Sequence, residues 1–352
     1  MARNSVMPLA IKASGMVTAA GFNSRSTCAA IRAGVTGIQK DNIGDPTAGE
    51  GMSVGRPRTL QWWEGPDMLA ELAAPAISEC LSTLPQREVE AGVPILVLLS
   101  PPGRPFREPD LGGIVLSGIQ HRLQKWASGG LNAFGVGRTG LLNALHHASQ
   151  LFSSKTATHA VVVGVDSFLR QEVVDAYMED RRVLTANNSN GFIPGEAACA
   201  ILVAPLSQQG EPELRIIGWG EGHENGTILS DKPVTGTGLT SALREALKVA
   251  GLKWADTQYW LTDQNAEHYK AKECTIAQIR LEKRDKPAER PFQIWHPIEF
   301  LGEIGSANGP CLLGVGLAAS KSCYGPGPLA LMSIGEDSGE RAAFVLEWHT
   351  RS

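Results

Sequence analysis

The chain has 352 residues, of which 43% are hydrophobic and 19% charged, and its formal net charge is −4. This length is too long for one small core and short for three domains, and the composition allows a sizeable core to be buried. The small negative charge excludes a general attraction to nucleic acid or to an anionic membrane.

Apolar runs and helical periodicity alternate along the first part of the chain. In chain order we predict the strand Ala10–Gly15, the helices Ser26–Gly34 and Met68–Leu84, the strand Val93–Ser100, the helices Gly113–Trp126 and Leu141–Leu151, and the strands His159–Asp166 and Ala197–Ala204. Ser26 or Thr27 is the expected cap of the first helix, and residues 129–140 are expected to form a loop. Because apolar strands alternate with helices, the sheet should be mostly parallel and covered on both faces.

The second part of the chain repeats this pattern. Here we predict the helix Leu239–Ala250, capped by Thr240 or Ser241, the strand Thr257–Thr262, the helix Pro310–Ser320, and the strands Leu329–Gly335 and Ala342–Glu347. Both parts end as helix, strand, turn and strand, which indicates a weak internal duplication. The polar segment Ser207–Pro212 separates them, so we expect two domains, 1–207 and 208–352. The charged run Glu282–Arg290 is either a solvated loop or a docking patch for an acidic partner.

The cysteines and the N-terminal segment indicate the compartment. Six cysteines are scattered, mostly among alanine, leucine and valine, without a Cys-x-x-Cys pair or a metal-type spacing, as is typical of reduced core thiols. The first residues lack the long apolar run of a signal peptide, and no apolar run reaches the ~18 residues of a membrane-spanning helix. We therefore expect a soluble cytoplasmic protein with no metal and no cofactor.

The sequence contains four motifs whose order along the chain indicates its fold class. Arg181–Ala204 reads as a loop, a Gly-Phe-x-Pro-Gly-Glu turn and a strand, and residues 10–39 read as a strand, a glycine-rich turn and a helix. Leu141–Asp166 contains Ala-Leu-His-x-Ala followed by a valine-rich strand, and Gly302–Gly309 reads GEIGSANG. In order and spacing these motifs resemble those of β-ketoacyl synthases of the thiolase superfamily, over nearly the whole chain.

The resemblance implies a fold and an assembly. The fold would be α/β and thiolase-like, with two duplicated βαβαβαββ halves in five layers, αβαβα, and the active site at their seam. It also implies a homodimer, in which the strand His159–Asp166 would pair across a two-fold axis, and a setting in fatty acid or polyketide biosynthesis.

The catalytic residue types of that family are absent. The family uses a cysteine thiolate at the start of a buried helix, where the helix dipole favours the anion, and two histidines. Counted back from Ala144-Leu145-His146, the cysteine position falls on Arg138, or on Thr139 if the register shifts by one. The nearest match to the first histidine is Asn265, and the second corresponds to Glu303.

The positions that match the structural part of the family pattern remain. Phe192, Gly195 and Glu196 lie in the first turn and Gly305 lies in the second, so we expect them beside the same pocket. Because the family's catalytic residues converge, we expect Arg138 and Glu303 to form an ion pair that fills it. Removal of one partner of a buried pair costs about 3–5 kcal/mol.

These replacements leave more than one function open. The resemblance favours a degenerate, non-condensing pseudoenzyme that acts as a binding or accessory subunit, with a ketosynthase subunit, an acyl carrier protein or acyl-CoA as its partner. The alternative is an active acyltransferase or thioester-handling enzyme that uses Thr139, His146, Asn265 and Glu303. An unrelated α/β protein that shares only the helix–strand alternation is a third interpretation.

Other candidate residues have structural interpretations. His146 and His147 fit helix packing, Cys311 fits a core position, and Gly236–Gly238 fits a helix start rather than a phosphate loop. Asp263, Glu267 and His268 could form a metal or acid–base cluster, but their spacing matches no known ligand motif. A Cys274–His268 dyad is disfavoured because the two residues would face nearly opposite sides of a helix.

Overall fold

Ten strands of the described chain form one sheet that runs through the molecule in a computed structural model, which describes residues 7–45, 49–59, 63–208, 210–285 and 292–350. All strands of the described chain, including two outside this sheet, are β1 (Leu9–Val17), β2 (Gln39–Asp45), β3 (Glu50–Val54), β4 (Ile95–Leu98), β5 (Leu131–Phe134), β6 (Ala160–Ser167), β7 (Glu196–Pro205), β8 (Glu213–His223), β9 (Tyr259–Thr262), β10 (Gln293–Trp295), β11 (Leu329–Gly335) and β12 (Glu340–His349). Strands β2 and β3 form a separate hairpin.

The described chain contains nine α-helices, most of which pack on the sheet or between its parts. They are α1 (Ser24–Arg32), α2 (Pro66–Leu81), α3 (Gln86–Ala91), α4 (Leu111–Leu123), α5 (Gly140–Ser153), α6 (Gln171–Glu179), α7 (Thr237–Ala250), α8 (His268–Glu282) and α9 (Asn308–Lys321). Helix α6 instead packs beside the hairpin of β2 and β3. Among these described residues, no helix is both long and apolar enough to cross a membrane.

The two parts of the sheet have the same topology. The strand order is β5-β4-β6-β7-β1 in one part and β10-β9-β11-β12-β8 in the other, so each part places its strands in the order third, second, fourth, fifth, first. The first strands, β1 and β8, pair over a short stretch and join the two parts. The second part runs β8-α7-β9-α8-β10-α9-β11-β12, the predicted βαβαβαββ succession, and the first part follows it with insertions. The duplicated fold is confirmed; the domain boundary after residue 207 stays a prediction.

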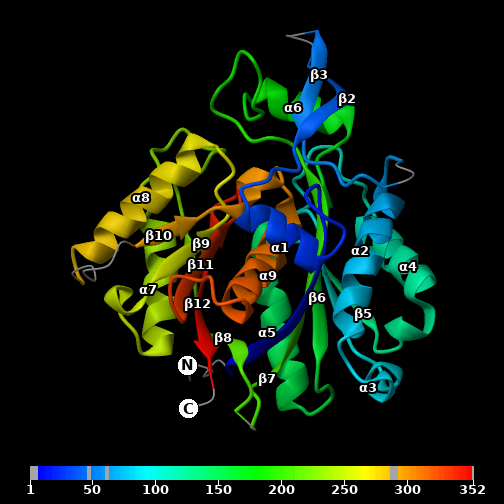
Figure 1. Ribbon diagram of the computed structural model, residues 1–352. Coiled ribbons are helices and arrows are strands. Elements are labelled where there is room, and N and C mark those ends of the chain that lie inside the picture. The colour runs from blue at the N-terminus through cyan, green and yellow to red at the C-terminus, as the bar shows by residue number, and fades with distance from the viewer. Residues whose placement is uncertain (1–6, 46–48, 60–62, 209, 286–291, 351–352) are drawn as a thin grey trace.

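The alternation of side chains in the strands produces five layers. Val97 on β4 faces α2 and α4, whereas Leu96 and Leu98 on the same strand face α5 and α9. On β12, Phe344 contributes to the same central core, whereas Val345 faces α7 and α8. Because successive residues of a strand point to opposite faces, each half-sheet separates two helical layers. Figure 1 shows α2 and α4 on one side, α5 and α9 between the half-sheets, and α7 and α8 on the other side.

The prediction of a mostly parallel sheet is wrong. Five of its nine strand pairs are antiparallel, and four are parallel. The last two strands of each half run back along one another, and the first strands meet antiparallel at the junction. Apolar periodicity indicates that a strand is buried but does not give its direction.

Several local predictions also need correction. The expected loop 129–140 contains β5, a short strand whose apolar pattern is obscured by the surrounding glycines. Helix α1 is capped by Asn23, whose side chain accepts from the Ser26 N–H, and α7 begins earlier than expected, after Gly236. The charged run 282–290 lies partly outside the described residues.

The strand predicted to pair across a two-fold axis cannot do so. His159–Asp166 corresponds to β6, which is hydrogen-bonded to β4 on one side and to β7 on the other. Both of its edges are therefore occupied inside the sheet. The strand at the end of this half-sheet is β5, which pairs with β4 and with no other strand of the described residues.

Candidate functional site

The candidate site lies where β5 leads through the 3-10 turn η2 (Gly137–Thr139) into α5. Gly137 has a φ of +71°, and a Cβ on it would lie 2.0 Å from a carboxylate oxygen of Glu336. The turn therefore requires a left-handed residue without a side chain. The backbone N–H of Arg138, at the start of the helix, donates to Glu336 over 2.7 Å. A side-chain carboxylate thus occupies the anion-binding end of this helical segment.

The guanidinium of Arg138 is enclosed by carboxylates, and only 2% of the residue is exposed. Its Nε donates to Glu303 over 3.2 Å, and its Nη1 donates to Glu336 over 3.1 Å and to Asp337 over 3.2 Å. Its Nη2 lies 3.2 Å from the second oxygen of Glu303. The ion pair expected between Arg138 and Glu303 is present. The three carboxylates offset the unfavourable position of a cation at a helix N-terminus.

Glu303 is completely buried and accepts hydrogen bonds from several groups. The backbone N–H of Gly305 donates over 2.8 Å and the side-chain amide of Asn308 over 3.0 Å, and the Asn265 amide also donates to it. Burial alone would raise the pKa of Glu303, but the charge of Arg138, the charge of Lys270 and the hydrogen bonds from Arg138 and from the Gly305 N–H lower that pKa to about 2. The carboxylate is therefore ionised at neutral pH.

Further ion pairs extend this arrangement. Arg182 donates to Glu267 over 2.9 and 3.0 Å and to Asp337 over 2.6 Å, and Lys270 donates to Asp263 over 2.9 Å. We call the whole set the buried charge cluster; it contains three cations and five carboxylates, namely Arg138, Arg182, Lys270, Glu303, Glu336, Asp337, Glu267 and Asp263. The cluster holds more acidic than basic groups.

Two neighbouring carboxyls of the buried charge cluster have opposite pKa shifts. Burial favours the neutral form of Asp337, but the charges of Arg138 and Arg182 hold its pKa well below the usual range. Burial also raises the pKa of Glu336, and the Asp337 carboxylate adds to this effect, although Arg138 opposes it. Of these two carboxyls, Glu336 is therefore the one that is protonated more easily, and a proton there would reduce the excess negative charge of the cluster.

Two other predicted pocket residues lie next to the buried charge cluster. Thr139 precedes α5 as its N-cap but makes no side-chain capping hydrogen bond. Gly305 has a φ of +53°, and a Cβ on it would lie 2.0 Å from a carboxylate oxygen of Asp166. That carboxylate accepts from the N–H and the hydroxyl of Ser306 and pairs with Arg104 over 2.9 Å. A second ion pair thus lies beside the Gly305 turn.

The predicted residues of the Gly-Phe turn pack against the backbone segment that carries Glu303. Phe192 is buried in an aromatic cluster, and Glu196 is buried at the start of β7, where it accepts from a serine hydroxyl. A Cβ on Gly195 would lie 3.1 Å from the carbonyl oxygen of Glu303, and the N–H of Glu303 donates to the carbonyl of Ile193 over 2.7 Å. These contacts fix the backbone that carries Glu303.

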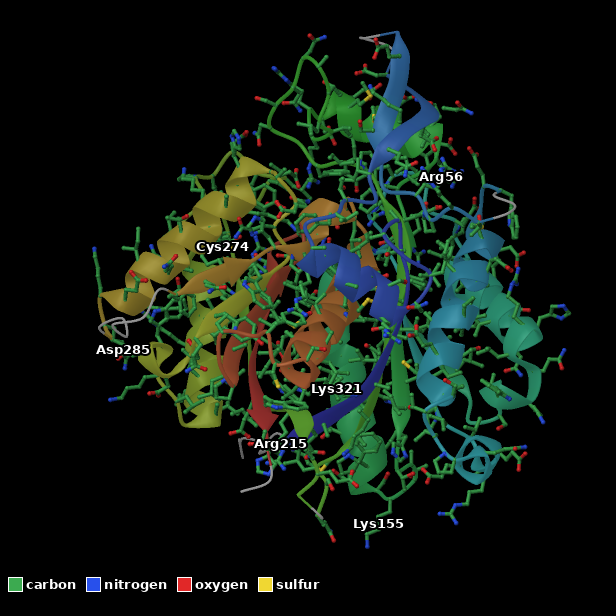
Figure 2. All side chains as sticks on the ribbon, in the orientation of Figure 1. Arg56, Lys155, Arg215, Cys274, Asp285 and Lys321 are labelled. Carbon is green, nitrogen blue, oxygen red and sulfur yellow. The ribbon has the colours of Figure 1, made fainter. Side chains whose placement is uncertain are left out.

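The other candidate residues do not join into a catalytic arrangement. His146 accepts from the indole N–H of Trp219 over 3.1 Å, a packing role. Cys274, labelled on α8 in Figure 2, is buried, and burial raises the pKa of its thiol. His268 is exposed at the start of the same helix, and Cys311 lies in the central core.

The hypothesis of a metal or acid–base cluster at Asp263, Glu267 and His268 has no support. Asp263 and Glu267 pair with cations in the buried charge cluster. In the ranges that the structure describes, no three His, Cys, Asp or Glu side chains lie so that they could hold a metal ion.

Sequence reasoning missed half of the buried charge cluster. Glu336 and Asp337 lie in the turn between β11 and β12, and Lys270 lies in α8, for which no motif was recognised. Arg182 lies in the loop of the Arg181–Ala204 motif, but no role was predicted for it. The sequence feature that could have indicated Glu336 and Asp337 is a pair of consecutive acidic residues directly after a buried strand, in Gly-Glu-Asp-Ser-Gly. Carboxylates at that place are rarely buried without cations.

Chemically, the buried charge cluster pairs charges within the chain, and Arg138 stands at its centre. A guanidinium is a donor that stays protonated and cannot accept an acyl group. The nearby carboxylates and the Asn265 amide already have partners inside the protein.

Comparisons with solved structures give the same fold. A chain in the structure of a ketosynthase in complex with its chain length factor, from Xenorhabdus doucetiae, matches 99% of this chain and 100% of its own length, with a TM-score of 0.72 and 14% identity. A structure of a type II polyketide acyl carrier protein in complex with its ketosynthase matches 97% of this chain and 99% of its own, with a TM-score of 0.76 and 14% identity. A ketosynthase from module 6 of the bacillaene synthase of Bacillus subtilis 168 matches 97% of this chain and 72% of its own, with a TM-score of 0.77 and 15% identity.

Sequence comparisons alone find no relative. No protein-family model matches the chain, and neither does any curated protein. The likeness is therefore carried by the arrangement of helices and strands over almost the whole chain, and the chain has the thiolase-like fold of ketosynthases and chain length factors.

Proposed function

We propose that this chain is a non-condensing accessory subunit that binds a ketosynthase, as the chain length factor of the Xenorhabdus complex does. The proposal takes the start of α5 as the counterpart of the ketosynthase nucleophile position. Arg138 and Glu303 then replace the cysteine and one histidine of the resemblance, and Asn265 replaces the other.

One observation carries this proposal. The side chain at the start of α5 is a buried guanidinium whose contacts are carboxylates of the same chain. The pocket that would receive a thioester is therefore filled, and the helix N-terminus that would stabilise a thiolate already binds Glu336.

The alternative of an acyltransferase with other residues has less support. The Asn265 amide donates a hydrogen bond to Glu303 inside the buried charge cluster, and the indole N–H of Trp219 donates one to Nε2 of His146. These groups therefore already have partners within the protein. Thr139 would need a general base within hydrogen-bond reach, and its hydroxyl makes no capping bond that would orient it.

The open edge of β5 supports a protein partner. Its second edge carries no strand of the described chain, and unpaired edges are sites where another chain can add. Val136 lies two residues after the end of this strand and is 41% exposed, as is Ile114 on the adjacent α4. We propose that a ketosynthase subunit covers this edge; a second copy of the chain and an acyl carrier protein are outcomes to be separated by experiment.

The experiment uses the full chain with a ketosynthase that retains its cysteine and is encoded beside it. Copurification and analytical ultracentrifugation should give a one-to-one complex, and Val136→Asp should abolish it. Val249→Asp on α7 is the matched control, because Val249 is also 41% exposed but lies in the opposite outer layer. A stable homodimer with no binding to the ketosynthase would reject the accessory role.

The absence of condensation is tested separately. Incubation of the purified chain with acetyl-CoA, malonyl-CoA or an acylated carrier protein should add no covalent mass in intact mass spectrometry. An acyl adduct on any residue would favour the acyltransferase alternative.

A further inference from the structure

A second cavity, away from the buried charge cluster, has the properties of a ligand site. It measures about 310 Å³ and lies between the C-terminal end of α1, β10, the turn η4 (Pro297–Phe300) and α9. Figure 1 shows α1 and α9 side by side in front of the sheet, and Figure 2 labels Lys321 at the end of α9, three residues before Tyr324 of the cavity wall. Its volume is near the lower end for small-molecule pockets, which suits a compound with one or two rings.

Flat aromatic surfaces form one wall of this cavity. The rings of Trp295 and Tyr324 are nearly parallel, with an interplanar angle of 20° and centroids 6.2 Å apart. Tyr259 packs behind Trp295 at 4.8 Å and supports it. Val315, which is almost completely buried, and Phe300 add apolar surface. A wall of this kind favours a planar apolar ligand body over a flexible polar one.

The rim of the cavity carries a cation without an anionic partner. The guanidinium carbon of Arg32 lies 4.4 Å from the centroid of the Tyr324 ring. In the part of the chain that the structure describes, Arg32 makes no ion pair and its guanidinium no hydrogen bond. The arginines of the buried charge cluster, Arg138 and Arg182, have several carboxylate partners each. The planar fork of Arg32 is therefore available to a carboxylate.

Among the described residues that line the cavity, Glu299 is the only acidic one, and it already has a partner. Glu299 lies 3.3 Å from Nε2 of His296, three residues earlier, and both are at the exposed rim. This carboxylate would repel a ligand with a second negative group. The lining thus fits one anionic group at Arg32 and a flat ring system against Trp295 and Tyr324.

We infer that this cavity binds a planar aromatic monocarboxylate, with its carboxylate on Arg32 and its rings on the Trp295–Tyr324 wall. The inference is independent of the proposed function, because neither the start of α5 nor the edge of β5 contributes to the cavity. A ketosynthase complex could therefore form or fail to form without any effect on this result.

The test titrates the full chain with 2-naphthoate, observed by saturation-transfer NMR and calorimetry. At about −0.3 kcal/mol per non-hydrogen atom, the roughly 13 such atoms of 2-naphthoate correspond to a dissociation constant on the order of 1 mM. Neutral 2-naphthamide and cationic 2-naphthylmethylammonium should bind at least about tenfold more weakly, because they lose the charge-assisted hydrogen bonds. Equal binding of all three compounds, or no saturable binding, would overturn the inference.

Matched variants locate the site. Arg32→Gln should weaken 2-naphthoate about tenfold, whereas Arg25→Gln, on the same exposed helix but outside the cavity, should leave it unchanged. Glu299→Gln should strengthen binding, because it removes the only negative charge from the rim. Ile31→Trp should fill the cavity and abolish binding, with circular dichroism as the check on folding. An Arg32→Gln variant that binds like the parent chain would place the ligand elsewhere and refute the assignment.

Discussion

Arg138→Ala tests the buried charge cluster most directly. The substitution leaves the buried carboxylates of Glu303, Glu336 and Asp337 without the guanidinium that contacts all three. Breaking a buried ion pair by removing one partner costs about 3–5 kcal/mol. The pKa of Glu303 gives a second measure: its fall from 4.5 to about 2 corresponds to roughly 3 kcal/mol of stabilisation of the carboxylate.

The expected change is measurable by thermal unfolding. With an unfolding entropy of about 2 cal/mol/K per residue, a chain of 352 residues loses about 4–7 °C in Tm for this change in free energy. Arg122→Ala is the control, since Arg122 also pairs with two carboxylates, Asp67 and Glu71, but at the surface. Surface pairs contribute about 0–1 kcal/mol, so its Tm should change by about 1 °C or less.

The pH dependence of this difference has a defined sign. The pKa of Glu303 is depressed in the folded protein, so its contribution to stability is present above its unfolded value of 4.5 and is lost as the pH falls toward about 2. Arg138→Ala removes the main cause of the depression. The Tm deficit of the variant should therefore be smaller at pH 4 than at pH 7.5. A deficit under about 1 °C at pH 7.5, or one that is equal at both pH values, would show that Arg138 does not stabilise these carboxylates.

Three further predictions concern the same region. Gly137→Ala should lower the Tm more than Gly130→Ala, because both residues have positive φ but only a Cβ at Gly137 would meet the Glu336 carboxylate; equal losses in a thermal melt would mean that the carboxylate simply moves. Arg138→Cys should not restore acylation, because the remaining carboxylates raise the pKa of the introduced thiol, and mass spectrometry after incubation with an acyl thioester should find no adduct. Glu303→Gln should lower the Tm at pH 7.5 and should abolish most of the fall in stability that occurs as the pH drops below 4.5. If the variant still loses stability in this range, other carboxyl groups cause the loss.

The resemblance to β-ketoacyl synthases was sufficient to place Arg138 against Glu303. The two residues are 165 positions apart, and neither periodicity nor local propensity relates them. The link came from the family resemblance, which implies that the residue at the start of one buried helix and the turn GEIGSANG before another converge on one pocket. A fold in which these two helices share the central layer brings their N-termini together, and α5 and α9 do so here.

The other members of the buried charge cluster could not be predicted in this way. Asp337 and Glu336 lie in a short turn between two antiparallel strands, where acidic residues are common at the surface. Their burial depends on where β11 ends relative to α5, which is a tertiary relation. The misassigned β5 has a related cause, since a four-residue strand flanked by glycines is too short to show a period.

The composition of the buried charge cluster follows from the helix that it closes. The first N–H groups of a helix need acceptors, and an apolar side chain at this place would leave the N–H of Arg138 unsatisfied. Glu336 supplies the acceptor, but a carboxylate buried there requires a cation, and Arg138 supplies it from the same turn. The remaining donors of that guanidinium then require Glu303 and Asp337. Each polar group is thus a consequence of the one before it, and the N-terminus of this helical segment is stabilised by charges of the protein itself.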